Sequence, residues 1–216
     1  MNPQELYDHG NHCIQEGQWM DAVQAFREYI AQTGGTSEAY TNMGLAYAGF
    51  KRFDLALEQW HKAVELNSDD SAAYFNMARA YLDMRKCAES EVAIEKALCI
   101  MPNEPGFLRL HGKILDTKGE LEKAVKAYAR ALELEPNSFE ACNSLGILFG
   151  KLGKIEDAVK SLESAIRIKP DNGGALANLA LAYWQHENME KARHYARLAE
   201  KQGGRLHPEL SRALRT

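Results

Sequence analysis

Six small residues recur at intervals of 34 positions along this chain. They are Gly10, Gly44, Ala78, Gly112, Gly146 and Ala180, and no insertion or deletion breaks the register. A fixed period of this length is typical of repeat architectures, in which each repeat is one supersecondary unit that packs on its neighbours. The 216 residues are therefore expected to form one continuous array, with no unrelated globular domain.

The remaining columns of the repeat predict two helices in each unit. When the recurring small residue is numbered position 8, positions 20 and 27 are also almost always small. Positions 4, 7, 11 and 24 are mostly large and apolar, as Tyr40, Met43, Tyr47 and Trp60 show in the second unit. Spacings of three and four place such residues on one helical face. Two helices approach to about 8 Å where their contact residues are small. Each unit should therefore be a pair of closely packed helices of three to four turns.

Glycine and proline mark the ends of these helices. Gly17, Gly119 and Gly153 occupy position 15, where the chain leaves the first helix and where glycine adopts a left-handed conformation without strain. Prolines 102, 136 and 170 occupy position 32 and should end the second helix. Asn137 and Glu140 are spaced as in a capping box for the next helix.

This pattern resembles the tetratricopeptide repeat (TPR) family. The resemblance covers about residues 3–204 and is carried by stretches such as AYTNMGLAY (39–47), GELEKAVKAYARALELEPN (119–137) and GKIEDAVKSLESAIRIKPDN (153–172). It implies an all-α fold, a right-handed superhelix of helix-turn-helix repeats. We expect one TPR solenoid domain over 1–216, with repeats at about 3–36, 37–70, 71–104, 105–138, 139–172 and 173–204 and a capping helix at about 207–215.

Three positions depart from the family pattern. Tyr29 in the first repeat stands where a small residue is expected. In the third repeat, Cys87 stands where an aromatic residue is common, and Ser90 replaces alanine. We expect looser packing around these residues and no change of fold.

Composition argues against several classes of function. A net charge of −4 is not that of a nucleic-acid-binding polyelectrolyte. No stretch approaches the ~20 apolar residues of a transmembrane helix, and the N-terminal sequence lacks the basic and apolar parts of a signal peptide. We expect a cytoplasmic protein without direct membrane insertion. Cys13 and Cys142 fall on core positions and should be reduced, buried thiols.

The sequence offers little for catalysis or metal binding. His9, His12 and Cys13 have a helical spacing that a metal could use, but His9 and Cys13 occupy core positions 7 and 11, which favours packing. No nucleophile elbow, phosphate-binding glycine loop or paired-carboxylate motif is present. We expect no catalytic residue, no metal and no cofactor.

The resemblance implies that the first helices of the repeats line a concave groove, with positions 2, 5, 6, 9, 12 and 13 facing outward. Asn42, Asn76 and Asn178 share position 6, with Asn11 and Asn143 nearby. A primary amide both donates and accepts hydrogen bonds, so such a series could hold a peptide backbone, as in the asparagine ladder of some TPR superhelices. The alternative is that asparagine is simply tolerated on a solvated face.

A second candidate feature is cationic and aromatic. The outward positions also hold Phe75, Arg79, Arg109 and Lys113, a set suited to an acidic or carboxylate-ended segment, and Tyr7 near the N-terminus. The alternative is that these cations pair with acidic residues of the same surface. The family's carboxylate clamp for C-terminal peptides is not reproduced, because its lysine and arginine positions hold Tyr7, Ala72 and Asn76.

The sequence therefore predicts a non-enzymatic scaffold that binds an extended or helical segment of a protein or peptide partner in its concave groove. No nucleic-acid partner is expected. The alternative is a self-assembling scaffold, similar to bacterial assembly factors or magnetosome-type scaffolds. Such a homo-oligomer would form through the terminal helix and the groove.

Overall fold

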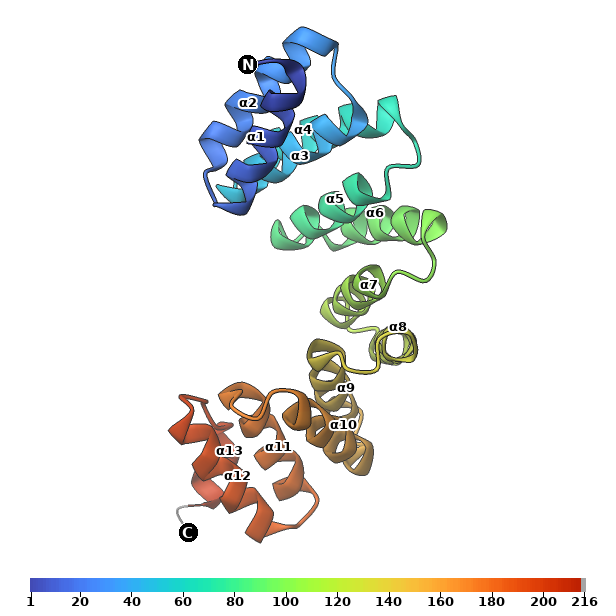
Figure 1. The fold of residues 1–216 in the computed structure, drawn as a ribbon. Coiled ribbons are helices and arrows are strands. Elements are labelled where there is room, and N and C mark those ends of the chain that lie inside the picture. The colour runs from blue at the N-terminus through green and yellow to red at the C-terminus, as the bar shows by residue number, and fades with distance from the viewer. Residues whose placement is uncertain (215–216) are drawn as a thin grey trace. The chain divides into compact units, whose positions relative to one another are not determined.

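The structure, a computed structural model, describes residues 1–214, and in that range it is all helical, as the sequence predicts. Consecutive helices pack as antiparallel pairs (Figure 1), and we call the first helix of each pair an A helix and the second a B helix. The A helices are α1 (Pro3–Gln15), α3 (Ser37–Gly49), α5 (Ser71–Asp83), α7 (Pro105–Thr117), α9 (Phe139–Lys151) and α11 (Gly173–Gln185). The B helices are α2 (Trp19–Thr33), α4 (Phe53–Leu66), α6 (Cys87–Ile100), α8 (Leu121–Leu134), α10 (Ile155–Ile168) and α12 (Met189–Lys201), and α13 (Pro208–Ala213) follows.

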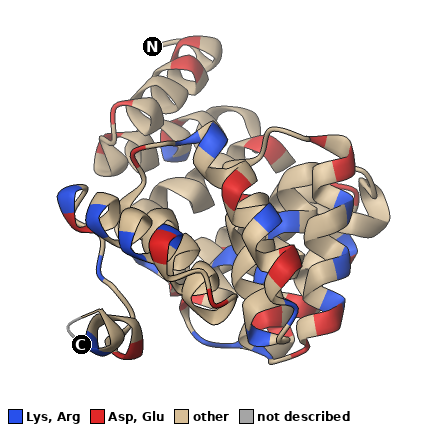
Figure 2. Cartoon of the chain, turned by 90° about the horizontal axis from the view of Figure 1, so that it is seen from below, with Lys and Arg blue, Asp and Glu red and all other residues tan. Residues whose placement is uncertain are grey.

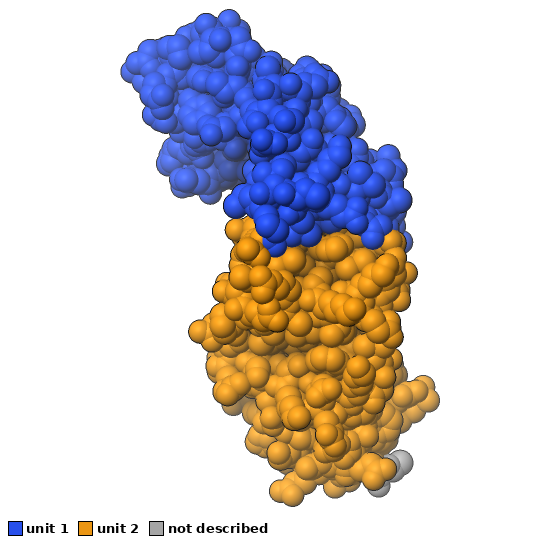
Figure 3. Space-filling view, turned by 90° about the vertical axis from the view of Figure 1, so that its right-hand side faces the viewer, with its two compact units in different colours: residues 1–102 blue, residues 103–216 orange. Residues whose placement is uncertain are grey.

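The chain divides into two compact units, residues 1–102 and 103–216 (Figure 3). Unit 1 contains α1 to α6, and unit 2 contains α7 to α13. Within unit 1, α1 contacts α3 and α3 contacts α5, so the A helices form one layer. Within unit 2, α7, α9 and α11 contact one another in the same succession. The outward side of each layer is the surface on which the sequence places its candidate residues.

The small residue at position 8 is required by the close packing of each helix pair. A methyl group added at Gly44 would lie 2.5 Å from Nε1 of Trp60, which is buried at position 24 of the partner helix. Gly10 meets Phe26 in the same way. Ala78 stands opposite the smaller Ile94, and both are fully buried. In these three pairs the small residue at position 8 makes room for the buried side chain at position 24, which accounts for its recurrence every 34 residues.

The turn between the two helices of a pair has one fixed backbone geometry. Gly17, Gly119 and Gly153 have φ of +70°, +80° and +72°, which confirms the left-handed conformation predicted for them. The same position holds Lys51, Arg85 and Glu187 in the other repeats, also left-handed, with φ near +60°. The turn thus imposes its conformation even on residues with a β-carbon, at a cost of about 1–2 kcal/mol each. The three B helices followed by proline end two residues before it, as predicted.

The structure corrects some predictions at individual positions. His9, predicted to be a core residue, is exposed, because among the described helices α1 packs mainly against α2 and α3, whereas α3 packs also against the preceding α2. Thr41, predicted to face outward, is buried, and its hydroxyl donates to Asp70 Oδ2 at 2.8 Å. The predicted capping box at Asn137 and Glu140 does not form, since Ser138 is the N-cap of α9.

Buried cysteines and the last helix complete the fold. Cys13 and Cys142 are buried, as predicted, and burial raises the pKa of both thiols. In α13, Leu210 is fully buried in a cluster of unit 2 that includes Tyr183 and Ala196. Residue 215, which the sequence includes in the capping helix, lies outside the described residues.

Candidate protein-interaction site

The candidate residues lie on A helices of both units. We define the A face of unit 1 by Tyr7, Asn11, Asn42, Phe75, Asn76 and Arg79, on α1, α3 and α5. The A face of unit 2 is defined by Arg109, Lys113, Asn143 and Asn178, on α7, α9 and α11. Arg79 and Lys113 are exposed, and the other eight residues are partly buried.

A hydrogen-bonded group joins α1 to α3 on the A face of unit 1. Asn42 Nδ2 donates to Asn11 Oδ1 at 2.9 Å and lies 3.4 Å from the Tyr7 hydroxyl oxygen. The Tyr7 hydroxyl donates to a carboxylate oxygen of Glu38 at 3.3 Å. Burial, followed by the nearby Glu38 carboxylate, raises the pKa of Tyr7. The Asn42 amide therefore has a fixed orientation relative to α1.

The aromatic base of this group explains a departure from the repeat pattern. The Tyr7 ring packs against Tyr29 with a centroid distance of 5.3 Å and against Phe26 at 5.8 Å. Tyr29 occupies a position that is alanine in the other five repeats. At the N-terminal end it supplies aromatic surface that supports Tyr7, so its size has a local packing role.

The rest of the A face of unit 1 is formed by α5. The Arg79 guanidinium lies 5.8 Å from the centroid of the Phe75 ring, one helical turn away. A cation over an aromatic face is attracted by the ring quadrupole. Asn76, which lies between these residues in sequence, is partly buried. The segment therefore presents an aromatic surface, an amide and an exposed cation on one helix.

The two cations of the unit 2 face differ in their surroundings. Arg109 is paired within the chain, with Nη1 contacting Glu135 and Nε lying 3.6 Å from a carboxylate oxygen of Glu140. Its side chain is only 22% exposed, so the guanidinium is committed to these two carboxylates. Lys113, one turn further along α7, is exposed. Internal pairing, one of the two alternatives for the cationic residues, thus applies to Arg109.

The asparagines of unit 2 pair in the manner of those in unit 1. Asn178 Nδ2 donates to Asn143 Oδ1 at 3.3 Å, which links α11 to α9. In both units an amide thus donates to the amide of the preceding A helix. These hydrogen bonds were not foreseen, because the sequence gives the positions of the side chains on each helix but not the lateral distance between helices. The sequence signal that could have predicted these hydrogen bonds is the recurrence of asparagine at outward positions about 34 residues apart.

Metal-binding chemistry has little support at the histidine and cysteine cluster that the sequence singles out on α1. Cys13 Sγ lies 3.6 Å from Nε2 of His9 on α1. These two residues supply fewer protein ligands than the three or four typical of zinc sites. We therefore treat the contact as local packing at the end of the first repeat.

Comparison with protein-family models identifies the repeats. A model described as "Tetratricopeptide repeat" matches residues 7–71 and 41–106, and a model described as "TPR repeat" matches 112–153 and 148–186. The chain belongs to the tetratricopeptide repeat family. Together the matches cover most of the chain and both structural units.

Curated relatives of this TPR chain are similar only over parts of their length. The Hsp70/Hsp90 co-chaperone cns1 of Schizosaccharomyces pombe is 23% identical over 124 residues, which are 56% of this chain and 35% of that protein. The Hsp70-Hsp90 organising protein of Plasmodium falciparum is 31% identical over 100 residues, 46% of this chain and 40% of that protein. The BBSome complex member BBS4 of Bos taurus is 28% identical over 92 residues, 43% of this chain and 18% of that protein. The chain therefore spans well under half the length of these relatives.

Solved structures confirm the fold. The TPR protein YrrB, described as having an unusual peptide-binding site, matches with a TM-score of 0.71 and 24% identity over 84% of this chain and 93% of its own. A crystal structure of MamA matches with a TM-score of 0.71 and 20% identity, covering 79% of this chain and 93% of its own. PilF of Pseudomonas aeruginosa has a TM-score of 0.81 at 15% identity, with 89% and 88% covered. These likenesses support the right-handed TPR superhelix as the fold class.

Two properties of the surface bear on partners. In the view of Figure 2, Lys and Arg alternate with Asp and Glu along the helices, in keeping with the small net charge of −4. Within the part of the chain that the structure describes, no helix is both long and apolar enough to cross a membrane.

Proposed function

We propose that this TPR protein is a non-enzymatic scaffold for protein–protein interaction in the cytoplasm and that its A faces bind an extended or helical segment of a partner protein. Membership of the TPR family and similarity to co-chaperones support a role in protein interaction. The observation that carries the assignment to the A faces is the pairing of asparagine amides, Asn42 with Asn11 and Asn178 with Asn143.

The paired amides suit the recognition of a peptide backbone. A primary amide has two N–H groups and a carbonyl oxygen with two lone pairs, so a pair retains hydrogen-bonding capacity beyond its internal bond. Fixing the orientation of Asn42 in advance lowers the entropy cost of binding. Arg79 and Lys113 are exposed and would contact acidic side chains of the bound segment. We infer a partner segment with polar backbone contacts and some acidic character, and no nucleic-acid partner.

Similarity to Hsp70/Hsp90 co-chaperones does not determine whether this chain binds the C-terminal carboxylate of its partner. Those relatives are named for the chaperones with which they act. In this chain, the positions that would supply the lysines and arginine of a carboxylate clamp hold Tyr7, Ala72 and Asn76. None of the three carries a positive charge. We therefore propose an internal segment of the partner as the ligand, and not a C-terminal carboxylate.

Self-assembly through the terminal helix is the second candidate function. In this structure Leu210 of α13 is fully buried against its own unit, beside Tyr183 and Ala196. Exchange of α13 between chains would first require these contacts to open. Light scattering of the full chain and of a chain lacking residues 205–216 tests this alternative. A mass that is independent of concentration and equal to one chain would exclude it.

The proposed function is tested by affinity capture with four A-face residues changed to alanine. The variant combines Asn42→Ala, Asn76→Ala, Arg79→Ala and Arg109→Ala. A matched control carries four alanine substitutions on exposed B-helix residues, Glu58, Lys62, Lys126 and Lys160. Proteins captured by the wild type and the control but lost from the A-face variant, at equal helicity by circular dichroism, would support the assignment. Equal capture by all three would refute it.

A further inference from the structure

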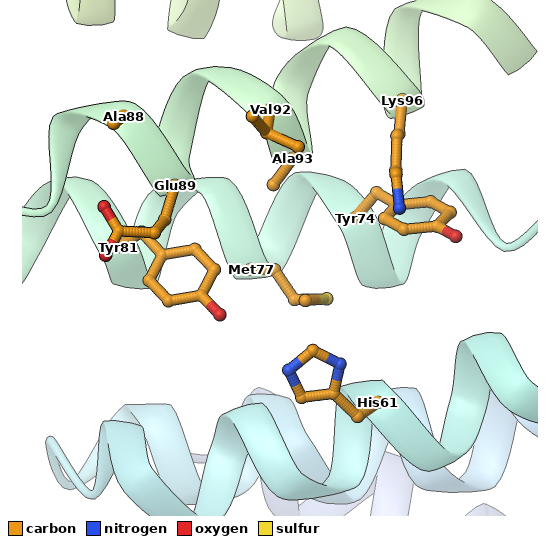
Figure 4. A pocket seen from close by; sticks show the side chains of 9 residues that line it. All are labelled: His61, Tyr74, Met77, Tyr81, Ala88, Glu89, Val92, Ala93 and Lys96. Atoms are coloured by element: carbon orange, nitrogen blue, oxygen red, sulfur yellow. The ribbon is translucent and has the colours of Figure 1, made fainter.

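A second candidate binding feature lies away from the A faces, in a cleft of about 350 Å³ between α4, α5 and α6 of unit 1 (Figure 4). Its floor comes from α5, and its two walls come from the B helices α4 and α6. Mostly apolar side chains line it, and charged groups lie at its margins. The lining residues are His61, Tyr74, Met77, Tyr81, Ala88, Glu89, Val92, Ala93 and Lys96.

A side-chain hydrogen bond that spans the equivalent space at two other helix junctions is not found at this cleft. Between α2 and α3, Arg27 Nη2 donates to the Tyr47 hydroxyl at 2.7 Å. Between α10 and α11, the Tyr183 hydroxyl donates to Glu163. The equivalent positions between α4 and α5 hold His61 and Tyr81, for which no hydrogen bond is found among the described residues. Figure 4 shows the His61 ring directed into the cleft, toward Met77.

Two residues on α6 remove the polar cover that other repeats have. Ala88 stands where four of the other repeats carry Asp54, Glu122, Glu156 and Glu190. Val92 is the only aliphatic residue in its column, which otherwise holds Gln24, Glu58, Lys126, Lys160 and His194. Val92 is 56% exposed, at the mouth of the cleft. The third repeat thus carries small or apolar side chains beside this cleft, at positions where most other repeats carry long polar ones.

The charges at the two ends of the cleft have opposite sign. Glu89 and Lys96 are seven residues apart on α6, which places them two turns, about 10 Å, apart along one side of the helix. Glu89 lies beside Tyr81, and Lys96 Nζ lies 5.2 Å from the centroid of the Tyr74 ring (Figure 4). Burial and the Glu89 carboxylate raise the pKa of Tyr81, so its hydroxyl is a neutral donor at this end.

We propose that this cleft is a docking site for an amphipathic helix of a partner protein, distinct from the A faces. The helix inserts apolar side chains between Tyr74 and Tyr81. It carries a carboxylate at the Lys96 end and a basic group at the Glu89 end. The lining residues of α6 extend over two turns, so a partner helix that lies along them presents apolar anchors at i and at i+3 or i+4. The volume is close to the lower limit of small-molecule sites and accommodates one or two large side chains.

The test uses a phage-displayed library of amphipathic helical peptides selected on the full chain. Enriched peptides are synthesised, and their dissociation constants are measured by fluorescence anisotropy. The blocking variant combines Ala88→Glu and Val92→Lys, which restores side chains that other repeats carry at these positions, so the fold should be retained. The matched control is Lys126→Ala, an exposed residue of α8 that occupies the same repeat position as Val92.

We expect peptides with apolar anchors flanked by one acidic and one basic residue. Their affinity should fall at least about tenfold in the blocking variant, because the apolar anchor can no longer enter the cleft, and should stay within about twofold in Lys126→Ala. Exchanging the charges, with Glu89→Lys and Lys96→Glu, should favour peptides of reversed charge order. Unchanged affinity in the blocking variant, enrichment of peptides without this pattern, or no enrichment would each overturn the proposal. A free chain that is dimeric as wild type and monomeric as the blocking variant would overturn it in favour of a second copy.

Discussion

Replacing Gly44 with alanine tests whether the 34-residue period arises from the packing of position 8 against position 24. The new methyl group would lie 2.5 Å from Trp60 Nε1, roughly 1 Å closer than ordinary contact. Trp60 is 1% exposed, and its indole N–H donates to the Thr41 carbonyl at 3.1 Å, so the ring has little room to move. Relieving the overlap therefore displaces a buried ring and strains a buried hydrogen bond.

The magnitude follows from three contributions. Overpacking of a filled core costs about 1–3 kcal/mol. Weakening the indole hydrogen bond adds about 0.5–1.5 kcal/mol, whereas the better helix propensity of alanine returns about 0.5–1 kcal/mol. We expect Gly44→Ala to lower the free energy of unfolding by about 1–3 kcal/mol. Gly150→Ala is the matched control, because a methyl group there meets nothing within 4 Å and should be neutral or slightly stabilising.

A double-mutant cycle with Trp60→Ile makes this prediction specific. The double variant Gly44→Ala, Trp60→Ile recreates the pair that Ala78 and Ile94 form in the next repeat. In the Trp60→Ile background, Gly44→Ala should be close to neutral, which corresponds to a coupling energy of about 1–3 kcal/mol. The measurement is urea unfolding followed by far-ultraviolet circular dichroism. An equal cost of Gly44→Ala in both backgrounds, or a stabilisation like that of Gly150→Ala, would refute the packing explanation.

Two further predictions concern backbone strain and acid stability. Arg85→Gly should raise the free energy of unfolding by about 1 kcal/mol, because it removes the strain of a β-carbon in the left-handed conformation. Gly119→Ala introduces that strain and should lower the free energy of unfolding by a similar amount. Thermal melting of both variants checks this pair. Hydrogen bonds from Lys118 and Lys123 hold the pKa of Glu120 at about 2, below the ordinary value of 4.5. The Glu120 carboxylate therefore contributes its full stabilisation above pH 4.5, and this stabilisation is lost as the pH falls toward 2. Glu120→Gln should therefore melt below the wild type at pH 7 and approach it near pH 2, and a difference that grows on acidification would contradict the assignment.

The helix pairs could be predicted from the sequence because close packing leaves a periodic signature. A glycine opposite Phe26 or Trp60 is a steric requirement, and its recurrence at 34 residues fixes the whole register. The left-handed turns at Lys51 and Arg85 were not predicted, because their side chains carry no preference for that conformation. There the neighbouring helices determine the geometry of the turn, and the residue adopts the left-handed conformation in spite of its steric strain.

The candidate site was predictable as a set of positions and not as a set of contacts. The period places Asn42 and Asn178 on outward positions of A helices, and the structure adds that each donates to an amide of the preceding A helix. Those bonds depend on the distance between neighbouring helices, which no local sequence pattern encodes. The exposure of His9 likewise depends on which helices pack around α1, and the sequence pattern of one helix does not give this.

The cleft on α6 shows how a repeat protein acquires a local feature without altering its fold. The small residues at positions 8, 20 and 27 of the third repeat, including Ser90, remain buried, so the stacking of its helices is preserved. Looser packing was predicted around Ser90, but this residue is fully buried and its hydroxyl donates to the Ala78 carbonyl at 2.7 Å. The cleft lies at outer positions, where Ala88 and Val92 stand in place of longer polar residues. In the described residues no hydrogen bond joins His61 to Tyr81. Ala88 and Val92 are exposed and lie outside the buried contacts of the helix pair, so a binding feature at these positions is compatible with the 34-residue framework.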